Sequence, residues 1–294
     1  MIIVGSQTGQ LCNNLFVFAH LLANAMEHNY VICNPAFCRY AHHFKATKYS
    51  LTSAYPQSKF RFKYPFMLRK KLYRIINKLS RYGNVNTYSI IPVKTLDISQ
   101  THDAVGSNYD LENAVFIKLR HETPILIISG WLFRDHDSLG KHGDKVRHFF
   151  EPLNQYGEAV REIVRVARVD CDVLVGVHIR QGDYRDYSNG RYYYDTSEYV
   201  AIMRKVMGLW GDRRVKYLIC SDQIHDETCF DDVPHTMGSH EVIEDLYAFA
   251  KCDYLIGPPS TFTQWASFYG KVPLCIIDHP QKILSIDQFC VWKG

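Results

Sequence analysis

The chain has 294 residues, of which 47% are hydrophobic and 22% charged, and its formal net charge is +4. This composition is typical of a soluble globular protein with one large domain or two ordinary ones. No run of about 18 apolar residues predicts a transmembrane helix, and the modest net charge argues against a nucleic-acid-binding protein. The start, MIIVGSQTGQLCNN, lacks the basic and long apolar regions of a signal peptide.

The first half begins with a strand at residues 1–5, a polar loop at 6–14, a helix at 15–28 and a second strand at 30–35. A polar loop at the end of the first strand points to a binding site there. Residues 37–115 are less regular. An apolar strand is expected over residues 124–135, ending in polar groups.

Residues 59–83 hold nine Lys or Arg and no acid, and from residue 66 on they predict a basic amphipathic helix. Its apolar positions are Phe66, Leu68, Leu72, Ile75, Ile76 and Leu79. Two interpretations are open: peripheral contact with an anionic membrane surface, or a solvated helix that packs its apolar face into the core. We favour the second.

The second half alternates strands and helices: strands at 172–179, 215–222, 254–260 and 271–278, and helices at 195–211, 240–253 and 261–270, the last with Gly270 as its C-cap. This order predicts an α/β fold with a parallel sheet covered on both faces. We place a domain boundary near residues 150–170, which divides the chain into 1–160 and 161–294.

Polar side chains follow three of these predicted strands. His178, Arg180 and Asp183 lie at the end of the first, Ser221 and Asp222 end the second, and Ser260 and Thr261 follow the third. Ligands bind at the carboxyl ends of parallel strands. The sequence therefore predicts one site at this edge.

The residue types suit a nucleotide phosphate, although each has a simpler explanation. Arg180 beside Gly182 can pair with a phosphate, or form a salt bridge with Asp183 or Asp186. Asp245 can accept both donors of a guanine edge, or merely stabilise a helix dipole. The helix start at 260–264 can bind phosphate, or Ser260 can be a plain N-cap.

We expect no metal. Asp170-Cys171-Asp172 precedes its strand and so lies at the wrong edge for a metal-diphosphate. The spacing of His225, Cys229, His235 and His240 fits no zinc template. Nine scattered cysteines without CxxC indicate free thiols in a reducing, cytoplasmic compartment. The absence of GxGxxG and GxxxxGK[ST] disfavours dinucleotide oxidoreductases and P-loop enzymes.

GVHIRQGDY at 176–184 resembles the HxRxxD signature of the fucosyltransferases, and most closely the bacterial α-1,2-fucosyltransferases of glycosyltransferase family 11. GQLCNNLFVFA at 9–19, ISGWLFRDHDSL at 128–139 and EDLYAFAKCDYLIGPPSTFTQWASFYG at 244–270 resemble further segments of that family. The resemblance covers most of the chain.

The resemblance implies a GT-B fold of two facing Rossmann-like domains, the first on the acceptor side and the second binding the donor. It also implies an enzyme of polysaccharide synthesis that transfers fucose from GDP-fucose to a glycan hydroxyl, expected to be galactose O2, with inversion and without cofactor or metal. We expect it in the cytoplasm, and residues 59–83 leave peripheral contact with an anionic membrane open. The resemblance makes Arg180, Asp183 and His178 catalytic. The donor-binding residues would be His178, Arg180, Asp222, Asp245, Ser260, Thr261, Thr263, Gln264, Gly9 and Asn13.

One departure concerns Gln181, because family members usually carry a second Arg there, and Asn13-Asn14 replaces the commoner Asn-Gln. Inversion needs a base for the acceptor hydroxyl, for which Asp183, Asp186 and Asp135 are candidates. A GDP-sugar transferase of another linkage, or a homologue that binds glycan or nucleotide with weak catalysis, remains an alternative. The acceptor and the oligomeric state are not readable.

Overall fold

The computed structural model describes residues 1–58, 62–81, 92–98 and 108–294, and divides the chain into two compact units. Unit 1 comprises Met1–Leu153 with Gly294, and unit 2 comprises Asn154–Lys293. The helix α5 (Asn154–Ala167) belongs entirely to unit 2. The division therefore falls before this helix, whereas the boundary expected after residue 160 would cut it.

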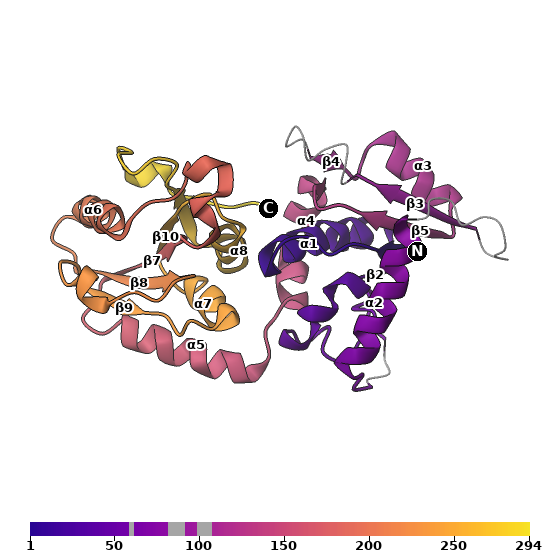
Figure 1. Ribbon diagram of the computed structural model, residues 1–294, viewed down its shortest axis with the longest axis horizontal. Helices are drawn as coiled ribbons and strands as arrows, with labels where there is room; N and C mark the ends of the chain where they lie inside the picture. The colour runs from indigo at the N-terminus through magenta and orange to yellow at the C-terminus, as the bar shows by residue number, and fades with distance from the viewer. Residues whose placement is uncertain (59–61, 82–91, 99–107) are drawn as a thin grey trace. The chain divides into compact units, whose positions relative to one another are not determined.

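Unit 1 contains a parallel sheet of four strands in the order β2-β1-β5-β3 (Figure 1). These strands are β1 (Ile2–Val4), β2 (Ile32–Cys33), β3 (Val93–Asp97) and β5 (Ile125–Ser129). Two short strands, β4 (Tyr109–Asp110) and β6 (Phe133–Arg134), pair separately. The helices are α1 (Leu11–His28), α2 (Phe66–Arg81), α3 (Ala114–Glu122) and α4 (His136–Phe149).

The prediction for residues 124–135 is wrong in one respect, because this run forms two strands in different sheets. β5 ends at Ser129, and Gly130 takes a φ of 125°, which a side chain would disfavour. The chain bends there and β6 begins at Phe133.

The helix α1 begins at Leu11, four residues before the predicted start, so Asn13 and Asn14 lie in its first turn and not in a loop. The Asn14 side chain donates to the carbonyls of Thr8 and Gln10, both at 2.7 Å, and accepts from the Thr8 N–H at 3.3 Å. These bonds tie the backbone of Thr8 and Gln10 to the first turn of α1. Asn14 thus closes the loop after β1.

Unit 2 contains a six-stranded sheet in the order β12-β11-β10-β7-β8-β9, parallel except at β12. Its strands are β7 (Val173–Ile179), β8 (Val215–Ser221), β9 (His235–Met237), β10 (Tyr254–Gly257), β11 (Pro273–Ile276) and β12 (Cys290–Val291). The strand β9 was not predicted, since its three residues HTM carry no apolar run.

Helices cover both faces of this sheet, as predicted (Figure 1). α6 (Thr196–Met207) packs on the face that carries Val173, Val175 and Val177. α7 (Val242–Phe249) and α8 (Thr261–Gly270) pack on the other, which carries His178. The alternation of side chains along β7 therefore turns His178 toward α7 and α8.

Gly270 is the last helical residue of α8 and not its C-cap, because Lys271 takes the left-handed conformation with φ 57°. The glycine is needed for another reason. A Cβ at Gly270 would lie 2.2 Å from the carbonyl oxygen of Ala250. The close approach of α8 to the end of α7 excludes any side chain here.

Candidate functional site

The predicted convergence of polar residues occurs at the carboxyl edge of the unit 2 sheet. Ile179 pairs with Ser221 in register, so the residues that follow β7 and β8 leave the sheet side by side. A Cβ at Gly257, the last residue of β10, would lie 3.0 Å from the Cβ of His178. Three strand ends therefore meet around His178.

Asp222 organises the turn after β7. Its carboxylate accepts hydrogen bonds from the backbone N–H of Gln181 at 2.9 Å and of Gly182 at 3.1 Å. A Cβ at Gly182 would lie 2.7 Å from Asp222 Oδ2, so a side chain here would push the carboxylate away from these N–H groups. Both oxygens face protein donors, which makes Asp222 a support of the site.

Arg180 forms a salt bridge with Asp183, one of the two roles that the sequence analysis considered for it. Its Nε and Nη2 donate to the two oxygens of Asp183, both at 2.8 Å, and Nε also lies 3.4 Å from Asp222. Burial alone would lower the pKa of Arg180, but the Asp183 hydrogen bonds and charge raise it above its usual value. The guanidinium is therefore a permanent cation at the strand end.

Asp183 differs from Arg180 in exposure: 58% of its side chain is accessible, against 18% for Arg180. The ion pair thus has a fixed, half-buried cation and a more exposed anion. An anionic ligand could take the place of the carboxylate without moving the guanidinium.

His178 is buried and neutral. Burial is the main cause that lowers its pKa to about 3, with a further contribution from the charge of Arg180. Its ring lies against Phe262, with centroids 4.9 Å apart, and its Nδ1 finds no hydrogen-bond partner among the described residues. A neutral imidazole cannot supply positive charge here, so its place is in the wall of the site.

Asp245 is buried in the first turn of α7 and faces the end of β9. Its Oδ1 accepts from the Ser239 N–H at 2.8 Å and from the Ser239 hydroxyl at 3.2 Å. Burial raises the pKa of Asp245, although the Ser239 hydrogen bonds partly oppose this. The Ser239 contacts tie this carboxylate to the end of β9, so Asp245 has a role beyond the helix dipole.

The turn before α8 shows the plain capping role that was the alternative for Ser260. Its hydroxyl accepts from the Phe262 N–H at 3.2 Å, and Thr263 donates back to the Ser260 carbonyl at 3.0 Å. Thr263 is fully buried, so its hydroxyl serves the turn. Thr261 and Gln264 are partly exposed on the same turn.

A polar pocket of about 460 Å³ opens beside this edge. It is lined by Gln181, Gly182, Arg185, Tyr193, Gln223, Ile224 and His225. Sequence reasoning missed most of these residues, because they lie in the loops after β7 and β8 and carry no motif. Gln181 itself donates to the Tyr194 carbonyl at 2.8 Å, which holds its side chain against the protein.

The remaining predicted residues lie in unit 1. Gly9 has φ +53°, and a Cβ there would lie 2.1 Å from the side-chain nitrogen of Asn13, so these two adjoin in the loop after β1. Asp135 is buried, and its oxygens accept from the Ser138 N–H at 2.8 Å and from Asn24 at 2.7 Å. This gives Asp135 a structural role as the cap of α4 and argues against it as a base.

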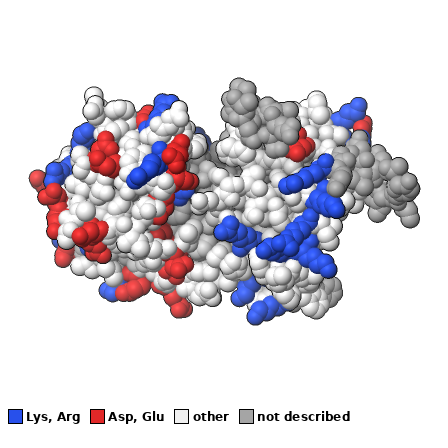
Figure 2. All heavy atoms as spheres, viewed as in Figure 1, with Lys and Arg blue, Asp and Glu red and all other residues white. Residues whose placement is uncertain are grey.

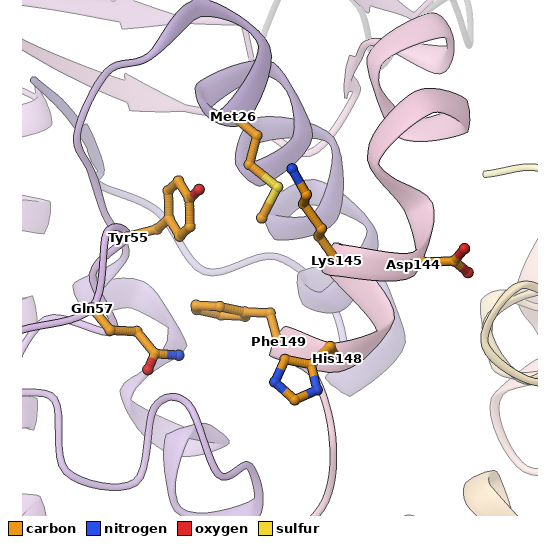
Figure 3. Close-up of a pocket in the computed structure, with 7 residues that line it drawn as sticks. All are labelled: Met26, Tyr55, Gln57, Asp144, Lys145, His148 and Phe149. Atoms are coloured by element: carbon orange, nitrogen blue, oxygen red, sulfur yellow. The ribbon is translucent and has the colours of Figure 1, made fainter.

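A second pocket, of about 560 Å³, lies in unit 1 between the ends of α1 and α4 (Figure 3). Met26, Tyr55, Lys145 and Phe149 are among its lining residues. Because α1 returns from the carboxyl end of β1 to the beginning of β2, this pocket lies at the amino edge of the sheet. It is therefore separate from the loop that holds Gly9 and Asn13.

Possible metal ligands do not gather. In the parts of the chain that the structure describes, no group of three or more His, Cys, Asp or Glu is arranged to hold a metal ion. His225 instead bonds the Ser221 hydroxyl at 2.9 Å. Asp172 binds Arg214 through both oxygens, and this holds its pKa down at about 2. All nine cysteines are free.

No protein-family model matches the sequence, and no curated protein matches it either. Several solved structures, however, superpose on this chain. A mutant of Arabidopsis thaliana FUT1 in complex with GDP superposes with a TM-score of 0.62 at 16% identity, over 99% of this chain and 73% of that one. The fucosyltransferase NodZ from Bradyrhizobium gives 0.55 at 11% identity, over 96% of each chain. POFUT1 in complex with GDP gives 0.53 at 10%, over 91% and 94%.

At these identities the likeness concerns the fold. The chain is an α/β protein with two Rossmann-like domains, the GT-B class that fucosyltransferases such as NodZ share, and the predicted fold class is confirmed.

Proposed function

We propose that this protein is a metal-independent glycosyltransferase that transfers L-fucose from GDP-fucose, with inversion, to a hydroxyl of a glycan, in the first instance O2 of galactose. The observation that carries the proposal is Arg180, a permanent cation at the end of β7, beside a backbone turn fixed by Asp222 and a buried Asp245. The GDP complexes of FUT1 and POFUT1 and the GDP-fucose complex of NodZ, which share this fold, support it.

In this proposal the donor occupies the carboxyl edge of the unit 2 sheet. Asp245 accepts the two N–H donors of guanine. The diphosphate takes the place of Asp183 on the Arg180 guanidinium, and the turn at Ser260–Gln264 lies beside it. The charge that develops on the leaving GDP is stabilised by Arg180, which is already oriented and needs no rearrangement.

Replacement of Asp183 by the diphosphate on Arg180 would free the carboxylate for a second role. Once the diphosphate holds the guanidinium, the Asp183 carboxylate is released at the rim of the site. We assign it as the base: it takes the proton of the acceptor hydroxyl while the new oxygen–C1 bond forms and the C1–phosphate bond breaks. GDP leaves with the electron pair. Asp186, three residues further on and exposed, is the second candidate.

The linkage depends on the acceptor site and not on the donor edge. NodZ, an α-1,6-fucosyltransferase, shares the fold, so the fold alone allows more than one acceptor hydroxyl. Gln181, where the resemblance leads us to expect Arg, donates its side-chain amide to the Tyr194 carbonyl and supplies no charge to an acceptor. A GDP-sugar transferase of another linkage is therefore the alternative.

The test is turnover of GDP-fucose in EDTA, with and without galactoside acceptors. We expect fucosyl transfer without added metal, and Arg180→Ala should lower kcat at least about 100-fold, the usual cost of removing one transition-state donor. Arg191→Ala removes a nearby exposed cation and should keep nearly full activity. Strict dependence on a divalent metal, or normal turnover by Arg180→Ala, would contradict the proposal.

A further inference from the structure

The helix α2 packs into unit 1 through polar side chains. Arg69, which is buried, donates to the Lys48 carbonyl, and Asn77 donates to the Gly5 carbonyl at 2.8 Å. The Tyr73 hydroxyl accepts from the Gln7 N–H at 3.3 Å. These residues follow one another at a spacing of four, so they form a single face of the helix. The inward face of α2 is thus polar, the reverse of an ordinary surface helix.

The apolar stripe that should have faced the core lies along the flank of α2 instead. Leu68 is 45% exposed and Ile75 50% exposed, and Leu72 and Leu79 between and beyond them are only partly buried. Met67 in the first turn is 69% exposed. The expectation that the helix packs its apolar face into the core therefore holds only in part, because Leu72, Ile76 and Leu79 are partly buried while Phe66, Leu68 and Ile75 are exposed. Residues 59–61, 82 and 83 of the basic segment lie outside the described residues.

Cations occupy the outward face beside this stripe, at Lys71, Arg74, Lys78 and Arg81. Figure 2 shows Lys and Arg gathered over α2. The whole stretch 28–96 contains 13 of the 34 Lys and Arg and none of the 30 Asp and Glu. The rest of the chain therefore carries a formal net charge of −9, although the total is +4. The net positive charge of the chain therefore comes from this stretch of unit 1.

We propose that α2 is a membrane-docking helix that lies on a surface rich in anionic lipid. Leu68, Ile75 and Met67 would enter the boundary between headgroups and acyl chains, and the neighbouring cations would bind the lipid phosphates. Nucleic acid would bind the cations, but its binding would not explain why Leu68 and Ile75 are exposed. A second copy of the chain would bring two cationic surfaces together. No described helix is long and apolar enough to cross a membrane, so the contact is peripheral.

The inward face connects this surface to the loop after β1. Asn77 and Tyr73 bind Gly5 and Gln7 at the carboxyl edge of the unit 1 sheet, and the same loop continues to Gly9. The helix therefore joins the lipid-facing surface to that edge. This position suits an acceptor glycan presented at a membrane, a consequence that rests on the proposed function, whereas docking itself does not.

The experiment is flotation of the full chain with vesicles of phosphatidylcholine containing 30% phosphatidylglycerol, compared with pure phosphatidylcholine, at low salt. We expect binding to the anionic vesicles only. Each cation near an anionic surface contributes about 1 kcal/mol, so Lys71→Gln/Arg74→Gln/Arg81→Gln should weaken partitioning on the order of 100-fold. Leu68→Gln/Ile75→Gln should weaken it about tenfold or more.

The matched control is Lys118→Gln/Lys251→Gln/Lys293→Gln, which removes the same charge from exposed positions elsewhere. It should float like the unaltered chain, and circular dichroism checks that all variants are folded. Absence of binding at low salt overturns the proposal, as does an equal loss in the control. If the apolar pair has no effect, the surface is a general polyanion site and the membrane assignment is wrong.

Turnover of GDP-fucose with a soluble acceptor should be unchanged in all three variants, which separates this test from that of the enzyme activity.

Discussion

At the scale of single residues, the ion pair of Arg180 and Asp183 combines two functions that sequence reasoning had treated as alternatives. The guanidinium is half-buried and held by two carboxylates, while its partner Asp183 is mostly exposed. Under the proposed function a diphosphate would replace this exposed anion, so that the salt bridge and the phosphate site would be two states of Arg180.

This exchange predicts opposite effects of Asp183→Asn on binding and on turnover. Removal of the competing negative charge should tighten GDP binding several-fold, while loss of the base should lower kcat about 100-fold or more. Calorimetric titration with GDP and a turnover assay give the two values. Asp186→Asn is the control and should change both less. Weaker GDP binding by Asp183→Asn would contradict the exchange.

Because His178 is buried in its neutral form, we expect the stability of the folded chain to depend on pH. Burial lowers the pKa of His178 to about 3 in the folded chain, whereas in the unfolded chain it protonates near 6.5. Its contribution is therefore fully present above pH 6.5 and is lost as the pH falls toward 3. Between pH 7 and pH 5 the unaltered chain should lose about 2 kcal/mol more in free energy of unfolding than His178→Gln. Urea unfolding at the two pH values measures this, and parallel losses would contradict it.

At the scale of elements, the close approach of α7 and α8 depends on Gly270, and the same approach brings the Ser260 turn and Asp245 to one edge. A Cβ at residue 270 would meet the Ala250 carbonyl at 2.2 Å, and backbone cannot yield as a side-chain tip can. The cost of such overpacking is about 1–3 kcal/mol or more.

Gly270→Ala should therefore lower the midpoint of thermal unfolding, with a loss of about 1–3 kcal/mol or more. Gly157→Ala in α5 is the matched control, because its Cβ would lie 3.7 Å from the flexible side chain of Arg161. That change should stabilise the chain by roughly 0.5–1 kcal/mol, the helix propensity difference. Equal effects of the two changes would refute the packing argument.

At the scale of the whole molecule, each unit has its own parallel sheet and its own core. The proposed donor edge belongs to unit 2 and the basic surface to unit 1. Neither a disulfide nor a metal cluster occurs in the described residues.

Accordingly, neither EDTA nor a thiol reductant should change the thermal midpoint, whereas GDP should raise it. At a GDP concentration of about 100 times its Kd the gain is about 2.7 kcal/mol, which corresponds to a rise of at least about 5 °C. Thermal scanning with each additive measures this. A fall in EDTA would point to a bound metal and contradict the proposed chemistry, and no shift with GDP would contradict the donor site.

Much of unit 2 could be predicted because its strands and helices carry strong local patterns. The strand β7, Val173–Ile179, is buried along its whole length, as its apolar residues indicate, and Asp195 caps α6 as its place before the helix suggested. The strand β9 and the pocket loops could not be predicted, since HTM has no apolar period and Gln223–His225 has no motif. The role of Asp222 depends on backbone N–H groups 40 residues away.

Periodicity, capping and turn chemistry act over a few neighbouring positions, so the strand-helix alternation and the residues that leave the three strand ends could be predicted from the sequence. The partner of each polar group depends on contacts between segments far apart in the chain. In the folded chain Arg180 pairs with Asp183, Asp135 caps α4, and the polar side of α2 faces inward. That last choice follows from backbone carbonyls at Gly5 and Lys48 that need donors, a demand that the helix sequence alone does not reveal.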